Sequence, residues 1–131
     1  MSNFEKNLEQ AINNAKRLTD KILIDGNLIS AQTNNKIPVL NPSTGDNIGS
    51  APQCNKDDVN IAVESAHKAF QKWKKIPARE RGKMVAAGAK RLEERKSEIE
   101  TLLSLDTGNA LRTQAIPETG ASIELTNMFA G

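Results

Sequence analysis

The chain has 131 residues, which is the length of one ordinary domain. Its 37% hydrophobic residues, 26% charged residues and net charge of +2 are typical of a globular protein and exclude a disordered chain or a strong polyanion binder. Three Phe, one Trp and no Tyr leave few rings for base stacking, so no nucleic-acid partner is expected. One Cys and one His exclude an intrachain disulfide and are too few for a zinc site.

Localisation is predicted from the same composition. The amino terminus has no apolar core of the signal-peptide type, and no apolar run approaches the roughly 20 residues that a membrane span needs. A single Cys fits a reducing compartment. We therefore expect a cytoplasmic protein without a membrane partner.

Residues 1–20 are predicted to form an N-terminal helical extension. Ser2 and Glu5 have the spacing of a capping box, and six apolar residues follow at helical spacing. The opposite face mixes both charge signs, which indicates a packing or oligomer arm rather than a membrane anchor. The apolar stripe consists of Phe4, Leu8, Ala11, Ile12, Ala15 and Leu18.

Residues 21–52 have the pattern of short strands. Asp25-Gly26 lies between two apolar runs, which predicts a tight hairpin. Residues 36–40 read as a third strand. Because proline cannot donate a ladder hydrogen bond, this strand is expected to lie at an edge or to place Pro38 on a side that is not hydrogen-bonded. The segment 41–46, Asn-Pro-Ser-Thr-Gly-Asp, is predicted to turn the chain into residues 47–52.

Helical spacing dominates after residue 55. Asn55 is the predicted N-cap of a helix that runs to Trp73, and Pro77 ends it or opens the next one. Ser97 and Glu100 have the spacing of a further helix start, and Gly108 is a natural C-terminal cap. A last helix is expected near residue 117. By itself, the sequence predicts an α+β chain of mostly helices with a few short antiparallel strands.

Catalytic groups are scarce. Cys54 lies in a loop beside Asp57 and Asp58, whose negative charge disfavours a thiolate, so we expect a plain loop thiol. His67 has no second His or Cys at ligand spacing and is predicted to lie at the surface. The chain lacks a Gly-rich phosphate loop, paired catalytic carboxylates and a Ser-His-Asp order. We assign no catalytic and no cofactor-binding residue.

Several short motifs, in order and at fixed spacing, resemble the N-terminal region of aldehyde dehydrogenases. They are "ILIDGNLI", "NPSTGDNIGSAP", a long segment from "DDVNIAVESAHKAFQKW" through "DTGNAL", and a final "MFAG". Each motif is weak alone, and their order over residues 22–131 is specific.

The resemblance implies an α/β parent fold with a Rossmann-type cofactor domain. Residues 21–131 would be the N-terminal part of that domain, truncated. Such enzymes use NAD or NADP to oxidise a small-molecule aldehyde to a carboxylic acid through a Cys thioester, in homodimers or homotetramers. The resemblance places the catalytic residues beyond this chain, so the rest of the same polypeptide is an expected partner and the chain alone is expected to be inactive.

The resemblance also implies a site for a monovalent cation, K⁺ or Na⁺, beside the turn 41–46. The matching ligands are the main-chain carbonyls of Val39 and Leu40 together with Asp106. A helix ending near Gly108 would present unpaired carbonyls and the negative end of its dipole to a cation. The alternative is that Asp106 caps the helix end and water satisfies the carbonyls.

A second functional class stays open: a stand-alone, non-catalytic helical interaction module that docks a partner. The last predicted helix stops within an apolar stripe at Gly131, which favours the enzyme. Sequence beyond Gly131 distinguishes the two, because a Gly-rich strand-turn-helix and a later Cys motif would indicate the enzyme.

Overall fold

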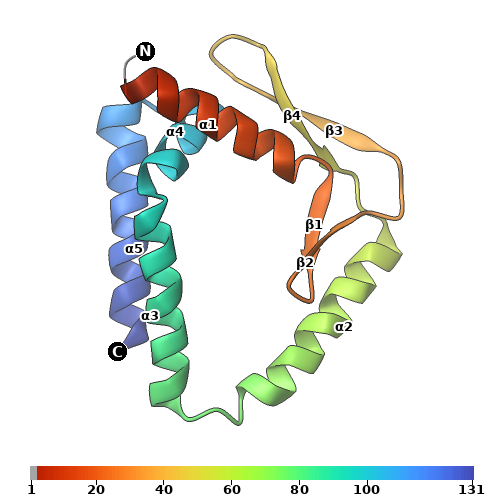
Figure 1. Ribbon diagram of the computed structural model, residues 1–131. Coiled ribbons are helices and arrows are strands. Elements are labelled where there is room, and N and C mark those ends of the chain that lie inside the picture. Colours follow the sequence, from red (N-terminus) through yellow and green to blue (C-terminus); the bar gives the residue numbers. More distant parts are fainter. Residues whose placement is uncertain (1–2) are drawn as a thin grey trace.

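The computed structural model describes residues 3–131, and the side chain of each of them except Phe4. Ser2 of the predicted capping box therefore lies outside the described residues. The elements, shown in Figure 1, are α1 (Asn3–Leu18), β1 (Lys21–Ile24), β2 (Asn27–Ser30), β3 (Lys36–Leu40), β4 (Asn47–Pro52), α2 (Lys56–Trp73), α3 (Ala78–Glu94), α4 (Lys96–Thr107), the π-helix η1 (Leu111–Ala115) and α5 (Ile116–Ala130). The predicted α+β class is confirmed.

The strands form two separate antiparallel ribbons, β1 with β2 and β3 with β4. In the first ribbon Ile24 pairs with Asn27. The two residues between them have positive φ, 52° at Asp25 and 74° at Gly26. Two successive positive φ angles are the geometry of a type I′ turn, which matches the twist of a two-residue hairpin. The Asp-Gly hairpin prediction is confirmed.

The second ribbon contains Pro38, opposite Ser50. A two-stranded ribbon leaves one edge of each strand unpaired, so a proline in β3 is tolerated, as predicted. The register shifts between Val39 and Leu40, just before the turn 41–46. This irregularity changes the direction of the strand end that leads into the turn.

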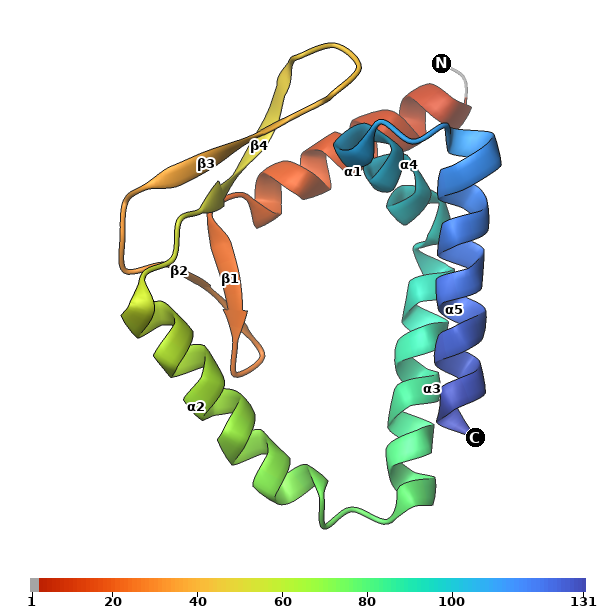
Figure 2. The same ribbon diagram turned by 180° about the vertical axis from the view of Figure 1, so that it is seen from behind.

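The helices other than α2 pack mainly in pairs. Helix α3 runs beside α5, and α1 lies across α4 in both views of the molecule (Figures 1 and 2). The fully or nearly buried apolar side chains are few and small, namely Ala11, Ala89, Ala115 and Ile123. A core of this size leaves many large apolar side chains exposed, among them Phe129 at 79% and Leu23 at 69%. No helix within residues 3–131 is long and apolar enough to cross a bilayer.

The backbones of α3 and α5 come into close contact at Gly82. A Cβ built on Gly82 would lie 2.1 Å from the carbonyl oxygen of Ala130, which is far inside van der Waals contact. Only glycine allows the two backbones to come this close. The pairing of α3 with α5 therefore depends on the absence of a side chain at position 82.

Helix α2 extends from the ribbons to a corner at residues 74–77, where the chain returns along α3 (Figure 1). Its start is fixed by the predicted N-cap: the Asn55 side chain accepts the backbone N–H groups of Asp57 and Asp58, each at 2.9 Å. The Asp58 carboxylate accepts the Asn55 N–H in return, completing a capping box. It also accepts the N–H of Gln32, which ties the segment after β2 to this helix.

Two local features differ from the sequence predictions. A new helix does begin here, but at Lys96, one residue before the predicted start at Ser97. Ser97 lies inside α4, whose N-cap is Arg95, because the chain bends at a single residue and then continues helically. The π-helix η1 was not predicted, since its wider turn has no spacing signature in a five-residue segment. The assignment of residues 1–20 as an extension separate from 21–131 stays a prediction.

Candidate cation-binding site

The segment 41–46 is a closed turn held by its own polar groups. The Asn41 N–H donates to the Asp46 carbonyl and the Gly45 N–H donates to the Asn41 carbonyl, both at 2.8 Å. The Asn41 side chain accepts the Ser43 N–H at 2.9 Å. Gly45 has a φ of 77°, which an L side chain rarely adopts. These bonds fix the end of β3 relative to the start of β4.

The turn packs against the carboxyl end of α4. Gly108 caps that helix with a φ of 74°, and its N–H donates to the Ser104 carbonyl at 3.0 Å. A Cβ on Gly108 would lie 2.8 Å from Cγ of Pro42. Glycine is therefore required here both for the left-handed cap and for the close approach of the turn. The two motifs "NPSTGD" and "DTG", about 60 residues apart in sequence, meet at this contact.

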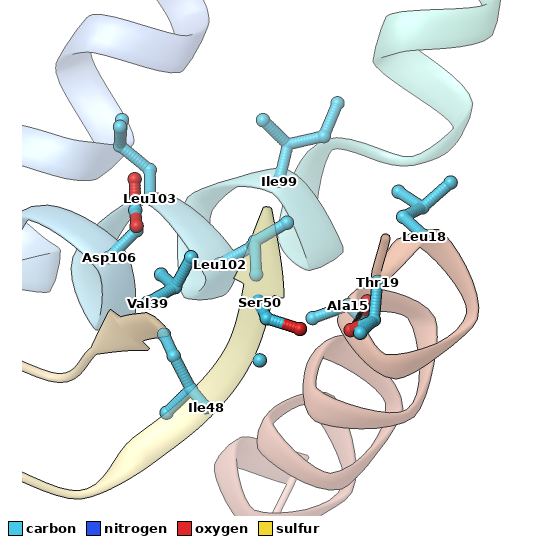
Figure 3. Close-up of a pocket in the computed structure, with 11 residues that line it drawn as sticks. Ala15, Leu18, Thr19, Val39, Ile48, Ser50, Ile99, Leu102, Leu103 and Asp106 are labelled. Atoms are coloured by element: carbon cyan, nitrogen blue, oxygen red, sulfur yellow. Dashed lines mark hydrogen bonds between the residues drawn. The ribbon is translucent and has the colours of Figure 1, made fainter. Parts of the chain in front are cut away.

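A cavity of about 380 Å³ opens beside this contact, between α1, the β3–β4 ribbon and α4. Figure 3 shows its side chains converging from these three elements. The lining is apolar except for Asp106, the hydroxyl of Thr19 just after α1 and the hydroxyl of Ser50 on β4. The residues are Ala15, Leu18, Thr19, Val39, Ile48, Gly49, Ser50, Ile99, Leu102, Leu103 and Asp106.

The three predicted cation ligands do not all reach this cavity. Val39 and Asp106 both lie on its lining, Val39 from β3 and Asp106 from α4, near each other in Figure 3. Leu40 does not line it, and its side chain is 49% exposed. Because the predicted ligand of Leu40 is a main-chain carbonyl, the direction of its side chain does not decide the matter. The structure thus brings two of the three residues to one cavity and places the third next to it in the chain.

The polar groups between α1 and the ribbon are already engaged. Ser50 Oγ donates to Asp20 Oδ1 at 2.6 Å, and the Asp20 N–H donates to the Ser50 carbonyl at 3.1 Å. The Lys36 ammonium pairs with the other Asp20 oxygen. The hydrogen bond from Lys36, followed by the bond from Ser50, lowers the pKa of Asp20 below its ordinary value. Asp20 therefore ties α1's end to both strands of the ribbon, and Asp106 is the single carboxylate that the described residues place on the cavity lining.

Within residues 3–131, no group of three or more His, Cys, Asp and Glu side chains comes together that could hold a metal ion. A transition-metal site of side chains is therefore not formed by the described residues. One carboxylate with main-chain carbonyls suits only a hard, weakly bound cation such as K⁺ or Na⁺.

Cys54 and His67, the two other residues considered for chemistry, both lie at the surface, as the sequence predicted. Cys54 is exposed in the loop between β4 and α2. His67 is exposed on α2, with its Nε2 3.1 Å from Nε2 of Gln71. Neither lines the cavity beside the turn.

The polar residues that organise this region were not all predicted from the sequence. Asp20 was not singled out, although it has a positive φ of 60°, and Ser50 was treated only as part of a strand. Their partnership spans 30 residues and leaves no local pattern. Asp58 did carry a signal, because Asn55-x-x-Asp58 has the spacing of a capping box.

Comparison with known sequences decides the family. A sequence model described as "Aldehyde dehydrogenase family" matches residues 28–131, which is most of the chain. The chain belongs to the aldehyde dehydrogenase family.

Individual aldehyde dehydrogenases support the assignment. The chain is 34% identical to a phenylacetaldehyde dehydrogenase of Pseudomonas fluorescens over 88% of its own length and 23% of the relative. It is 36% identical to the aldehyde dehydrogenase tropH of Talaromyces stipitatus, over 92% of the chain and 23% of the relative. The chain thus spans about a quarter of the length of the relatives that it matches.

Solved structures share the fold. HpcC from Thermus thermophilus superposes with a TM-score of 0.89 at 25% identity, over 95% of this chain and 24% of that one. Betaine aldehyde dehydrogenase from Staphylococcus aureus, in complex with NAD⁺, gives a TM-score of 0.87 at 27% identity, over 95% of this chain and 25% of that one. The arrangement of ribbons and helices is therefore that of an aldehyde dehydrogenase segment.

Proposed function

We propose that this chain is the N-terminal segment of an NAD(P)-dependent aldehyde dehydrogenase that oxidises a small-molecule aldehyde to a carboxylic acid through a Cys thioester. The observation that carries the proposal is the match of the family model over residues 28–131. The likeness to an aldehyde dehydrogenase solved with NAD⁺ supports the choice of a nicotinamide cofactor.

The described residues do not fit NAD or NADP themselves. Both ribbons are antiparallel pairs, so within residues 3–131 no parallel strand leads through a glycine-rich turn into a helix. The N-terminal amides of α2 are taken by the Asn55 side chain. We derive no cofactor step from this segment. Its contribution is a scaffold against which the rest of the same polypeptide would pack.

Cys54 is not the nucleophile in this proposal. It is exposed in a loop, and the nearest charged groups in sequence are the carboxylates of Asp57 and Asp58 and the ammonium of Lys56. A reactive thiolate needs a net excess of positive charge, a base or an open helix N-terminus beside it. The N-terminus of α2 is capped by Asn55 rather than open to the thiol.

The proposal includes a homodimer or homotetramer and a cytoplasmic location. The many exposed large apolar side chains support burial against further protein. The rival function, a stand-alone helical interaction module, is not favoured, since the family match covers the strands and helices together.

Formation of reduced nicotinamide tests the proposal. The full-length enzyme that carries this segment should reduce NAD⁺ or NADP⁺ with at least one member of an aldehyde panel, measured by absorbance. Cys54→Ser should leave that rate unchanged, and residues 1–131 alone should give none. Turnover by residues 1–131 that disappears in Cys54→Ser would contradict the assignment.

We extend the proposal to a K⁺ or Na⁺ ion held by the carbonyls of Val39 and Leu40 with Asp106. The support is that the turn 41–46 packs on the capped end of α4, and that Val39 and Asp106 share one cavity. The carboxyl end of a helix carries partial negative charge, which favours a cation.

Thermal unfolding of the full-length enzyme tests the ion. Its melting temperature should be higher in K⁺ or Na⁺ than in a bulky organic cation at equal ionic strength. Asp106→Asn should remove this difference. Asp46→Asn is the matched control, since Asp46 is an exposed acid of the adjoining turn that does not line the cavity. Equal melting temperatures in all three salts would leave the turn with a packing role only.

A further inference from the structure

The proposed cation site needs two elements at a fixed separation. Val39 would offer its carbonyl from β3, and Asp106 would offer its carboxylate from α4. The contact of Pro42 with Gly108 holds the tip of the β3–β4 ribbon on the end of α4. A two-stranded ribbon is not rigid by itself, and one that is held only at its tip can pivot. The position of Val39 therefore depends on a second point of attachment.

The end of α1 supplies this second point through Asp20. The Asp20 side chain accepts the Ser50 hydroxyl at 2.6 Å, and the Asp20 N–H donates to the Ser50 carbonyl at 3.1 Å. Lys36, at the start of β3, pairs with the other carboxylate oxygen. Ser50 lies opposite Pro38 in the ribbon. The strand residue that Asp20 holds is thus only one pair away from Val39.

The same helix is also attached to α4. The Asn14 side-chain amide donates to the Glu98 carboxylate at 2.7 Å, and α1 lies across α4 in both views (Figures 1 and 2). Asp106 follows Glu98 by eight residues in the same helix, which is about two turns. Helix α1 therefore connects the strand that carries Val39 with the helix that carries Asp106.

The end of α1 and the ribbon are in close contact. Gly49 pairs with Val39, and a Cβ built on Gly49 would lie 3.2 Å from the Thr19 hydroxyl oxygen. Thr19 and Ser50, from the two sides of this contact, line the same cavity as Asp106 (Figure 3). A shift of the ribbon at this contact would therefore move the part of the cavity wall on which Val39 lies.

We propose that Asp20 is a positioning residue for the cation site, because its hold on Ser50 sets the place of the Val39 carbonyl relative to Asp106. This role rests on the K⁺ or Na⁺ site proposed above. The backbone of Asp20 supports it: its φ of 60° lies in the left-handed region, which Asp and Asn adopt more readily than most residues. Groups that hold a metal ligand in place change ion affinity by about 10- to 100-fold when they are altered, without touching the ion.

A titration of the full-length enzyme with K⁺, and separately with Na⁺, tests the proposal. A bulky organic cation keeps the ionic strength constant, and the ion concentration that gives half of the rise in melting temperature measures ion affinity. Ser50→Ala removes the hydroxyl that Asp20 holds and keeps the Asp20 charge, whereas Asp20→Asn removes that charge and with it the pairing with Lys36. Each variant should raise the midpoint concentration about tenfold. Asp25→Asn is the matched control, because Asp25 also has a positive φ, 52°, and does not line the cavity.

The proposal is supported if both variants raise the midpoint while the control stays within about twofold of the unaltered enzyme. A melting temperature that falls equally at every ion concentration, with the midpoint unchanged, would show a structural role only and overturn it. So would a raised midpoint in Asp20→Asn without one in Ser50→Ala, which would show an effect of charge rather than of position, or an equal rise in Asp25→Asn. In each of these results the ion site itself stands. No response of the unaltered enzyme to either cation would instead remove the ion site, and the role of Asp20 with it.

Discussion

Helix α2 and the α3–α5 pair are of similar length and are held in different ways. Helices α3 and α5 pack side by side, and at Gly82 the space beside Ala130 is too small for a methyl group. Helix α2 is held at its N-terminus by the capping hydrogen bonds of Asn55 and Asp58. Along its length Val63 and Phe70 are 62% and 53% exposed. One unit is stabilised by packing and the other by capping, so they should respond to different substitutions.

The largest effect is expected where packing is tightest. Gly82→Ala should destabilise the full-length protein by about 2–3 kcal/mol, because its methyl group would collide with a carbonyl oxygen and push α5 away. The free energy of unfolding in denaturant measures this. Gly88→Ala, in the same helix, meets nothing within 4 Å and should be neutral or stabilising by about 0.5–1 kcal/mol. Equal unfolding free energies of the two variants would contradict the close contact between Gly82 and Ala130.

The next effect concerns the start of α2. Asp58→Ala removes acceptors for the Asn55 and Gln32 N–H groups and should cost about 1–2 kcal/mol. The loss should be local, appearing as faster amide hydrogen exchange in the first turns of α2 with little change in α3 and α5.

Asp57→Ala is the control for that substitution. Asp57 is exposed and contributes to the helix start mainly through its charge, so its loss should cost a few tenths of a kcal/mol. Slower folding or faster exchange throughout the protein in Asp58→Ala would show that α2 is not held separately.

The smallest of the three main effects is expected between α1 and α4. Glu98 accepts a hydrogen bond from Asn14 at 2.7 Å and pairs with Arg95 at 2.6 Å. The Arg95 hydrogen bond holds the pKa of Glu98 below its ordinary value, with the Asn14 bond adding to it. Glu98→Gln should therefore cost about 1 kcal/mol at neutral pH.

This contribution has a defined pH dependence. A lowered folded-state pKa stabilises the protein above the unfolded value of about 4.3, and that stabilisation is lost as the pH falls toward the folded value. The difference in unfolding free energy between Glu98→Gln and the unaltered protein should therefore shrink on going from pH 7 to below about pH 4. A difference that stays constant over this range would show that Glu98 contributes through shape rather than charge.

The sequence predicted what is encoded locally. The Asp-Gly hairpin, the Asn55 cap, the Gly108 cap and the helix start near Pro117 each depend on a few neighbouring residues, and each was found at its predicted place. The division into a mostly helical chain with short strands followed from these signals.

The site and the inter-helix contacts could not be predicted in the same way. Asp20 with Ser50, Asn14 with Glu98 and Gly82 with Ala130 join residues 30, 84 and 48 positions apart, and no periodicity marks such pairs. Val39 and Asp106 were placed together through a family resemblance rather than through their own chemistry. The resemblance left open whether the Leu40 side chain faces the cavity, because the bulge after Val39 decides it.

The π-helix η1 makes the segment before α5 sensitive to the deletion of a single residue. Its i to i+5 bond, from the Ala115 N–H to the Ala110 carbonyl at 3.2 Å, is the mark of one residue more than an α-helix needs. One residue turns a helix by about 100°. Deleting Arg112 would therefore rotate the start of η1 relative to the face of α5 that buries Thr119 and Ile123. The non-helical residues 108–110 join η1 to the cap of α4 and would have to absorb that rotation, so a deletion here would strain the link between the turn 41–46 and the α3–α5 pair even though no contact of either is removed.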